Sequence, residues 1–157
     1  MNDELIKRAK TIISKILYIT IATSNKLGIP WNTPVYSAFD KDYNFYWISW
    51  RKNQHSKNIK ENSQIFIVIY DSTAVEGQGH GVYIQAKAYE LDDNKEVEYA
   101  LKYLDGRINK TGRHKASQFQ GSKPRRIYKA VPEKVWVNTD IRINGEFVDD
   151  RIEINLN

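Results

Sequence analysis

The residues best suited to chemistry lie close together in one stretch, FYWISWRKNQHSKNIKEN, at residues 45–62. A strand-like run ends there in Ser49 and Trp50. The cationic and polar residues that follow directly are Arg51, Lys52, His55, Ser56 and Lys57. A phosphate is bound by charge-assisted donors around several of its oxygens, and the free N–H groups at a helix start add donors and a favourable dipole. The segment therefore predicts a site for a phosphorylated ligand, and solvated loop charges are the alternative.

Other chemistries find little support in this sequence. The chain has no cysteine, which excludes disulfides, thiolate zinc sites, iron–sulfur clusters and cysteine nucleophiles. His55, His80 and His114 lack the spacing of metal ligands, so we expect no metal. The glycines of residues 78–81 match neither the phosphate-binding loop nor the dinucleotide-binding motif.

The elements that must position residues 45–62 are mostly strands. Strand patterns cover residues 18–23, 31–39, 45–50, 64–71 and 81–91. Apolar residues at helical spacing predict helices over residues 2–17 and 92–108, and residues 51–63 are long enough for a short crossing helix. Pro34 interrupts the second strand pattern, which predicts a bulge or an edge strand.

The C-terminal third reads as short strands joined by tight turns over residues 125–156, with Asn144-Gly145 as the clearest hairpin turn. Residues 107–126 hold seven Lys or Arg residues. We expect a solvated loop there, with binding to a phosphate backbone or a cap over an active-site mouth as alternatives. Taken together, the elements predict an α+β, mostly β fold: an antiparallel barrel with flanking helices.

Length and composition agree with one domain over residues 1–157, since 157 residues with 41% hydrophobic content can bury a sizeable core. The net charge of +5 suits nucleic acid, a membrane surface or a phosphorylated small molecule, and charge alone does not choose among them. Residues 1–23 mix acids and bases into the apolar positions. We therefore expect no signal peptide, no membrane anchor and a cytoplasmic protein.

The order of these elements is similar to that of the pyridoxamine 5'-phosphate oxidase-like split barrels. The likeness rests on a helix, then YITIAT, a G-x-P-x-x-x-P-V segment, a strand ending in an aromatic and hydroxyl pair, and H-S-K-N-I. It extends through residues 64–91, and it covers the C-terminal third only loosely. The resemblance implies a Greek-key-like split β-barrel that binds FMN, with deazaflavin as a variant.

The resemblance also implies site residues, position by position. The flavin ring would be bordered by Thr33, Pro34, Val35 and Tyr36. Its other edge and the ribityl chain would meet Trp47, Ile48, Ser49 and Trp50. Ser56 and Lys57 fall on the phosphate-binding position, with Arg51, Lys52 and His55 as helpers. Gln85 lies where the family often has a polar residue beside a glycine, which Ala86 replaces here.

A homodimer is further implied, with the cofactor at the interface and the strands around Trp136 contributed by the partner. We predict a flavin-dependent oxidoreductase that acts with an unidentified small-molecule substrate or electron donor. The C-terminal part lacks the Arg-and-His substrate signature and the R-L-x-P ending of the true oxidases, so another substrate is expected. A flavin carrier without its own substrate and a basic nucleic-acid-binding barrel are the alternatives; we do not expect nucleic acid as the partner.

Overall fold

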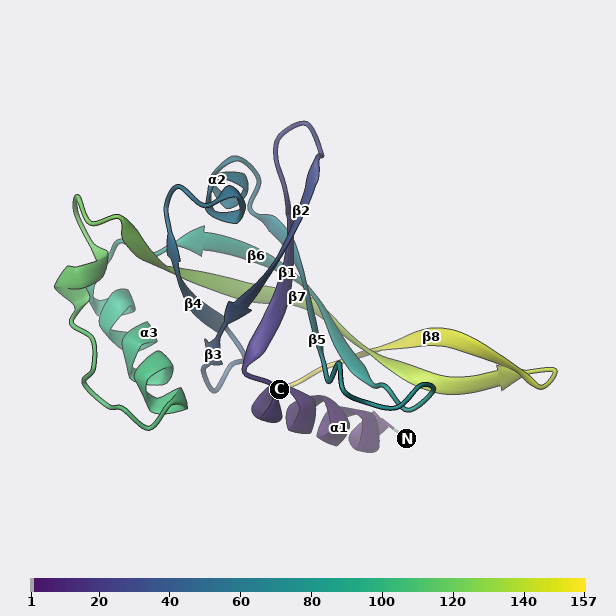
Figure 1. Ribbon diagram of the computed structural model, residues 1–157. Helices are drawn as coiled ribbons and strands as arrows, with labels where there is room; N and C mark the ends of the chain where they lie inside the picture. Colours follow the sequence, from purple (N-terminus) through teal and green to yellow (C-terminus); the bar gives the residue numbers. More distant parts are fainter. Residues whose placement is uncertain (1) are drawn as a thin grey trace.

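The computed structural model describes residues 2–157, leaving aside the side chain of Asp140, and its strands form one curled antiparallel sheet (Figure 1). The strands are β1 (Tyr18–Ser24), β2 (Pro30–Tyr36), β3 (Ala38–Phe39), β4 (Phe45–Trp50), β5 (Gln64–Tyr70), β6 (Gly81–Glu90), β7 (Arg125–Ile143) and β8 (Glu146–Ile154). Their order in the sheet is β2-β1-β5-β6-β7-β4-β3, and β8 pairs with β7. The result is a mostly β half-barrel with flanking helices, which confirms the predicted fold class.

Helices α1 (Asn2–Lys15) and α3 (Asn94–Arg107) pack over different parts of the curled sheet (Figure 1). Leu5, Ala9 and Ile13 form the buried stripe of α1, and they join a core built from inward-facing strand residues such as Ile21 and Ile67. The buried stripe of α3 forms a second core with β3, β4 and the 3₁₀ helix η1 (Ala116–Phe119). Each helix therefore covers the apolar residues of one part of the sheet.

Side chains near the ends of α3 fix its position. The Asp93 carboxylate caps the helix by accepting hydrogen bonds from the N–H groups of Lys95 and Glu96, both at 3.0 Å. The Arg107 guanidinium donates to the carbonyls of Ile13 and Ile16 at the end of α1, also at 3.0 Å. The Arg107 bonds tie the end of α3 to the end of α1. No helix among residues 2–157 is long and apolar enough to cross a membrane.

The proline in β2 is tolerated because this strand lies at the edge of the sheet. Pro34 pairs with Thr20 of β1, and β2 has no second strand partner, so a missing N–H costs no ladder bond. This confirms the edge alternative. The predicted strand over residues 31–39 is divided at Ser37, however, because β2 pairs with β1 whereas β3 pairs with β4.

The C-terminal prediction was wrong in one respect, because residues 125–143 form one long strand rather than short strands joined by turns. A register shift against β6 occurs between Gln85 and Ala86, opposite Lys134 and Pro132. The resulting bulge accommodates a proline within a paired strand, so the strand continues past it. The hairpin at Asn144-Gly145 is confirmed: both residues have positive φ, 52° and 87°, and the turn joins β7 to β8.

Candidate functional site

Ser49, near the end of β4, lies at the centre of a buried polar network. Helix α2 (Gln54–Glu61) begins four residues after β4, with Asn53 as its N-cap residue. Instead of capping the helix, the Asn53 amide donates to Ser49 Oγ at 3.1 Å. We therefore assign the Ser49 hydroxyl proton to its 2.6 Å contact with His55 Nε2. Burial lowers the pKa of His55, which keeps the imidazole neutral and suited to accept this bond.

These residues open onto a cavity of about 420 Å³ between β2, β4 and the loop after α3, which we call the β2–β4 cavity. Its lining residues are Thr33, Pro34, Val35, Tyr36, Ile48, Ser49, Asn53, His55, Leu104, Ile108, Arg113, His114 and Arg125. The Tyr36 hydroxyl is buried and has no hydrogen-bond partner among the described residues. Burial raises its pKa, against the opposing effect of Arg107. The phenol is therefore protonated and available to a ligand.

An Asp–His pair that sequence reasoning did not predict forms part of this cavity. His114 Nδ1 lies 2.6 Å from Asp105 Oδ1, and Asp105 Oδ2 accepts the backbone N–H of His114 at 3.0 Å. Asp105 is buried on α3, and His114 lines the cavity. The two residues stand nine positions apart without a recognised motif, so the sequence offered no clear indication that they meet.

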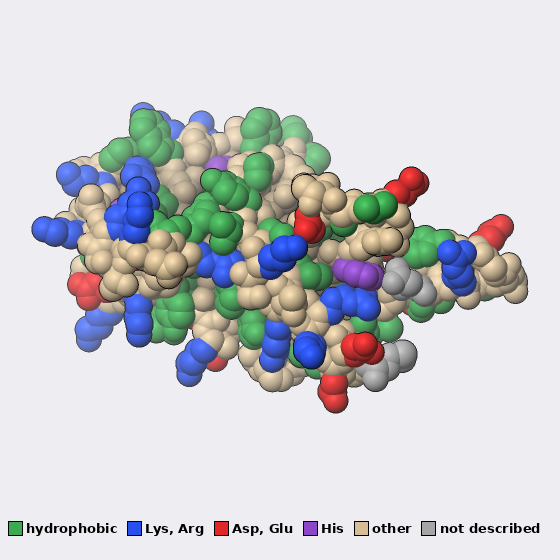
Figure 2. Space-filling view, turned by 60° about the horizontal axis from the view of Figure 1, so that its bottom comes forward, with side chains coloured by type: hydrophobic (Ala, Val, Ile, Leu, Met, Phe, Trp, Pro, Cys, Tyr) green, Lys and Arg blue, Asp and Glu red, His purple; other side chains and the backbone are tan. Residues whose placement is uncertain are grey.

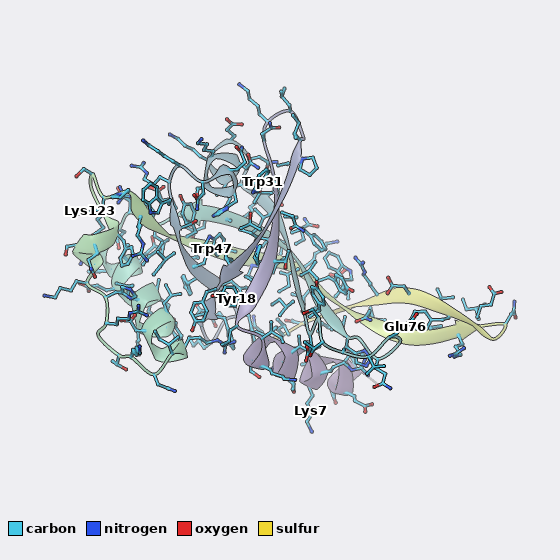
Figure 3. The ribbon with its side chains drawn as sticks, in the orientation of Figure 1. Lys7, Tyr18, Trp31, Trp47, Glu76 and Lys123 are labelled. Atoms are coloured by element: carbon cyan, nitrogen blue, oxygen red, sulfur yellow. The ribbon has the colours of Figure 1, made fainter. Side chains whose placement is uncertain are left out.

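A second cavity, of about 850 Å³, lies on the other side of α2, and we call it the lysine cavity. It is lined by the cations Arg51, Lys52, Lys57, Lys60 and Lys123, together with Ser56, Ile59, Ser63, Ala88, Tyr89, Glu90, Ser122, Pro124 and Tyr128. Figure 3 labels Lys123 at the end of the molecule near η1. Lys and Arg side chains also gather toward the α3 end in the view of Figure 2.

Glu90 contributes the one carboxylate among the described lining residues of the lysine cavity, and it already accepts three hydrogen bonds. It accepts hydrogen bonds from Arg126 Nε at 3.0 Å, from the Tyr128 hydroxyl at 3.2 Å and from Arg51 Nε at 3.3 Å. Burial, with the nearby carboxylate, raises the pKa of Tyr128 to about 12, so this phenol remains a donor. The four lysines have no carboxylate partner among the described side chains. The cavity therefore carries excess positive charge.

The structure thus divides the predicted site residues between two cavities. The β2–β4 cavity receives Thr33, Pro34, Val35, Tyr36, Ile48, Ser49 and His55, and the lysine cavity receives Arg51, Lys52, Ser56 and Lys57. The Ser56 hydroxyl is buried without a hydrogen-bond partner among the described residues. Their role in binding a cofactor stays a prediction.

Four predicted residues line neither cavity in the single chain. The Trp47 indole, labelled in Figure 3, is fully buried and stacks on Tyr128, with ring centroids 5.8 Å apart. Trp50 is half exposed next to Arg51. Gln85 and Trp136 lie on the outer face of the sheet, where Gln85 bonds to Glu133 at 3.2 Å and Trp136 stacks on Phe66. Among the described side chains, no group of three His, Asp or Glu residues is placed to hold a metal ion.

Comparison with known proteins identifies the family. A family model described as pyridoxamine 5'-phosphate oxidase matches residues 5–139. The chain belongs to this family. The match to the pyridoxamine 5'-phosphate oxidase family includes every lining residue of both cavities, so the candidate site lies within the family's own domain. No curated protein matches the chain significantly by sequence.

Solved structures share the fold of the pyridoxamine 5'-phosphate oxidase family with this chain at low identity. HutZ, the heme storage protein of Vibrio cholerae, is 15% identical over 85% of this chain and 94% of its own, with a TM-score of 0.66. A FAD-binding protein of Mesorhizobium loti is 15% identical over 83% of this chain and 91% of its own, with a TM-score of 0.61. An F420 reductase is 17% identical over 81% of this chain and 94% of its own, with a TM-score of 0.58.

Proposed function

We propose that this protein is a homodimeric FMN-binding oxidoreductase that acts on a small substrate. The observation that carries the proposal is the pair of cavities beside α2. One is lined by apolar strand residues with a few oriented polar groups, and the other is strongly cationic. An amphiphilic ligand with a planar ring at one end and a phosphate at the other matches this division. FMN has this composition.

The residues present fit the ring end of such a ligand. Pro34, Val35 and Ile48 offer an apolar wall, while the Tyr36 hydroxyl and the Ser49 network offer polar groups beside it. A buried hydroxyl without a partner is costly, and a ligand that accepts its proton removes this cost. The free hydroxyl of Tyr36 therefore supports a bound polar group at this position.

The residues also fit the phosphate end. Lys57 and Lys60 of α2 line the lysine cavity, and Arg51, directly after β4, lines it too. The N–H groups of the first turn of α2 have no capping side chain, so they add donors to the same region. Ser56, 2% exposed and without a partner among the described residues, supplies a hydroxyl. These groups would hold a phosphate by charge-assisted hydrogen bonds.

A bound flavin would supply the hydride and electron chemistry, while the protein positions the reactants. Arg113 and Arg125 give the β2–β4 cavity a positive wall that would stabilise negative charge on a reduced ring or on a substrate. Ser49 and the neutral His55 hold one side of the cavity rigid, because their hydrogen bond is buried and short. The Ser49–His55 pair would therefore orient a ligand without gaining or losing a proton.

The homodimer is supported by the outer face of the sheet. Phe66 and Trp136 stack there at a centroid distance of 6.1 Å, and Tyr83 lies on the neighbouring strand, with the Arg151 guanidinium 3.8 Å from its ring centroid. Half-buried aromatic residues on one face are typical of interfaces between protein chains. A second copy on this face would bring Gln85 and Trp136 to the partner's cofactor.

Deazaflavin instead of FMN, and a flavin carrier without its own substrate, remain variants of this proposal. The first is supported by the F420 reductase among the proteins of the same fold. The deazaflavin F420 and FMN have different absorption bands, so a titration followed by absorption shows which of the two binds. A carrier would bind the flavin yet reduce no acceptor.

The test is a titration of the purified chain with FMN and, separately, with F420, followed by visible absorption and flavin fluorescence. We expect FMN to bind at micromolar concentrations, with one flavin per chain and a dimer by sedimentation. Lys57→Ala should weaken binding about tenfold, since it removes one charge-assisted bond. Lys26→Ala, in the exposed turn between β1 and β2, is the matched control. Absence of binding by either flavin would overturn the proposal.

A further inference from the structure

The pair of His114 and Asp105 is built like an oriented acid–base group. Asp105 is 2% exposed, and both of its carboxylate oxygens bond to His114, at 2.6 Å to ring Nδ1 and 3.0 Å to the backbone N–H. A carboxylate accepts hydrogen bonds, so the Nδ1 proton of the imidazole is held in this contact. The other ring nitrogen, Nε2, is thereby left as the atom available to a ligand.

The surroundings of His114 place it in the β2–β4 cavity with groups that attract anions. Arg113 and Arg125 line the same cavity, and neither has a carboxylate partner among the described side chains. Phe119 packs edge-on against the imidazole at 5.5 Å, which restricts its rotation. His55, the other histidine of the cavity, is 4% exposed and engaged with Ser49, so it is not free to exchange a proton with a ligand.

We propose that His114 is the catalytic acid of this site, that Asp105 is its positioning residue, and that the substrate is a small anion with an electron-poor double bond. The inference rests on the proposed function, since the flavin would supply the hydride. The hydride adds to one atom of the double bond. In the reactive form His114 is an imidazolium, with one proton on Nδ1 held by Asp105 and a second on Nε2. The Nε2 proton adds to the other atom with the π electron pair, and the N–H electron pair stays on the imidazole, which becomes neutral.

In this step, Asp105 stays a carboxylate throughout, because its role is to hold the proton on Nδ1 so that Nε2 faces the substrate. The imidazole regains its proton from solvent after product release, since the side chain of His114 is 15% exposed. A nicotinamide dinucleotide or another two-electron donor would supply the electrons for the next hydride. Arg113 and Arg125 orient the substrate through its negative charge.

The orientation is tested without any cofactor, by NMR of the chain labelled with ¹⁵N-histidine. We expect neutral His114 to carry its proton on Nδ1 and to respond to added benzoate, an unreactive anion. In Asp105→Asn, the tautomer should move toward protonated Nε2, while the signals of His55 and His80 stay unchanged. Averaged tautomers in the wild-type protein, or no response to benzoate, would overturn the inference.

The proton transfer is tested with FMN-loaded protein reduced by dithionite and mixed with three acceptors in stopped flow. These are 3-maleimidopropionate, which is anionic, N-ethylmaleimide, which is neutral, and ferricyanide, which takes electrons without a proton. The chain has no cysteine for the maleimides to alkylate. We expect His114→Gln to slow maleimide reduction by about 10²-fold or more, with ferricyanide reduction unchanged. His80→Gln, which alters a histidine outside the cavity, is the matched control.

The outcomes separate the inference from the function on which it rests. If FMN binds but His114→Gln reduces both maleimides as fast as the wild-type protein, the inference fails and the proposed function stands. If neither flavin binds, the proposed function fails and the catalytic role of His114 fails with it. Equal loss with ferricyanide would show a structural role for His114 and would also overturn the inference.

Discussion

The two cavities beside α2 satisfy their polar groups in opposite ways. In the β2–β4 cavity, Ser49 with His55 and Asp105 with His114 form short internal pairs, both at 2.6 Å. In the lysine cavity, the one carboxylate is already engaged, and its four lysines remain without a carboxylate partner among the described side chains. The first cavity is therefore preorganised before any ligand arrives, whereas the second carries charge that a ligand must neutralise.

This difference teaches which measurement reports on which cavity. Internal pairs contribute to the stability of the empty protein, because breaking one leaves a buried group unsatisfied. Unpaired lysines contribute little to stability, and their effect appears when an anion binds. Substitutions in the internal pairs should therefore act mainly on the unfolding free energy, and substitutions of the unpaired lysines mainly on ligand affinity.

The largest effect is expected from Arg51→Ala combined with Lys57→Ala. Removing two charge-assisted donors should weaken FMN binding about 100-fold. The unfolding free energy should change little, because Lys57 is unpaired among the described side chains and the ion pair of Arg51 with Glu90 is half exposed. Riboflavin, which has the same ring without the phosphate, should bind both proteins alike. An equal loss of riboflavin binding would show that these residues contact the ring. It would contradict the assignment of the phosphate to the lysine cavity.

Ser49→Ala should act on stability instead. It removes the partner of His55 Nε2 and of the Asn53 amide, and should lower the unfolding free energy by about 1–3 kcal/mol. Urea unfolding of the flavin-free protein measures this loss. Ser122→Ala, in the lysine cavity, serves as the control and should change stability by less than about 0.5 kcal/mol.

The pH dependence of stability tests the contribution of the buried Ser49–His55 pair separately. Because burial lowers the pKa of His55 below its ordinary 6.5, the unfolded chain binds a proton on this residue at a higher pH than the folded chain does. The contribution of neutral His55 is complete above about pH 6.5 and is lost as the pH falls toward the lowered folded value. His55→Asn should remove this part of the pH dependence in urea unfolding at pH 5 to 8. A variant with the wild-type slope would contradict the assignment.

The smallest effect is expected from Tyr36→Phe. Its hydroxyl is buried without a partner among the described residues, so its removal should leave stability unchanged or raise it by up to about 1 kcal/mol. If a bound flavin accepts this proton, FMN affinity should fall about three- to tenfold at the same time. Thermal unfolding with and without FMN measures both effects. A destabilised flavin-free variant would show that the hydroxyl is satisfied within the chain.

Much of the fold followed from the sequence, because local patterns suffice where neighbouring residues decide the structure. The helical spacing of Leu5, Ala9 and Ile13 predicted the buried face of α1, and Asn144-Gly145 predicted the last hairpin. Pro34 predicted a bulge or an edge strand, because a missing N–H has the same consequence in any fold, and β2 lies at the edge. The single strand over residues 125–143 was not predicted, since the bulge that accommodates Pro132 depends on pairing with distant β6.

The sequence by itself determined that a cationic segment containing Ser56 follows β4 at the start of a helix. Only the tertiary structure decided how this segment is divided. His55 and Ser56 are consecutive, but successive residues on a helix point about 100° apart, so the two side chains face different cavities. The pairing of Asp105 with His114 likewise depends on where α3 ends and how its loop returns to the sheet. Residue types are local information, whereas the direction in which each side chain points is set by packing between elements that lie far apart in the chain.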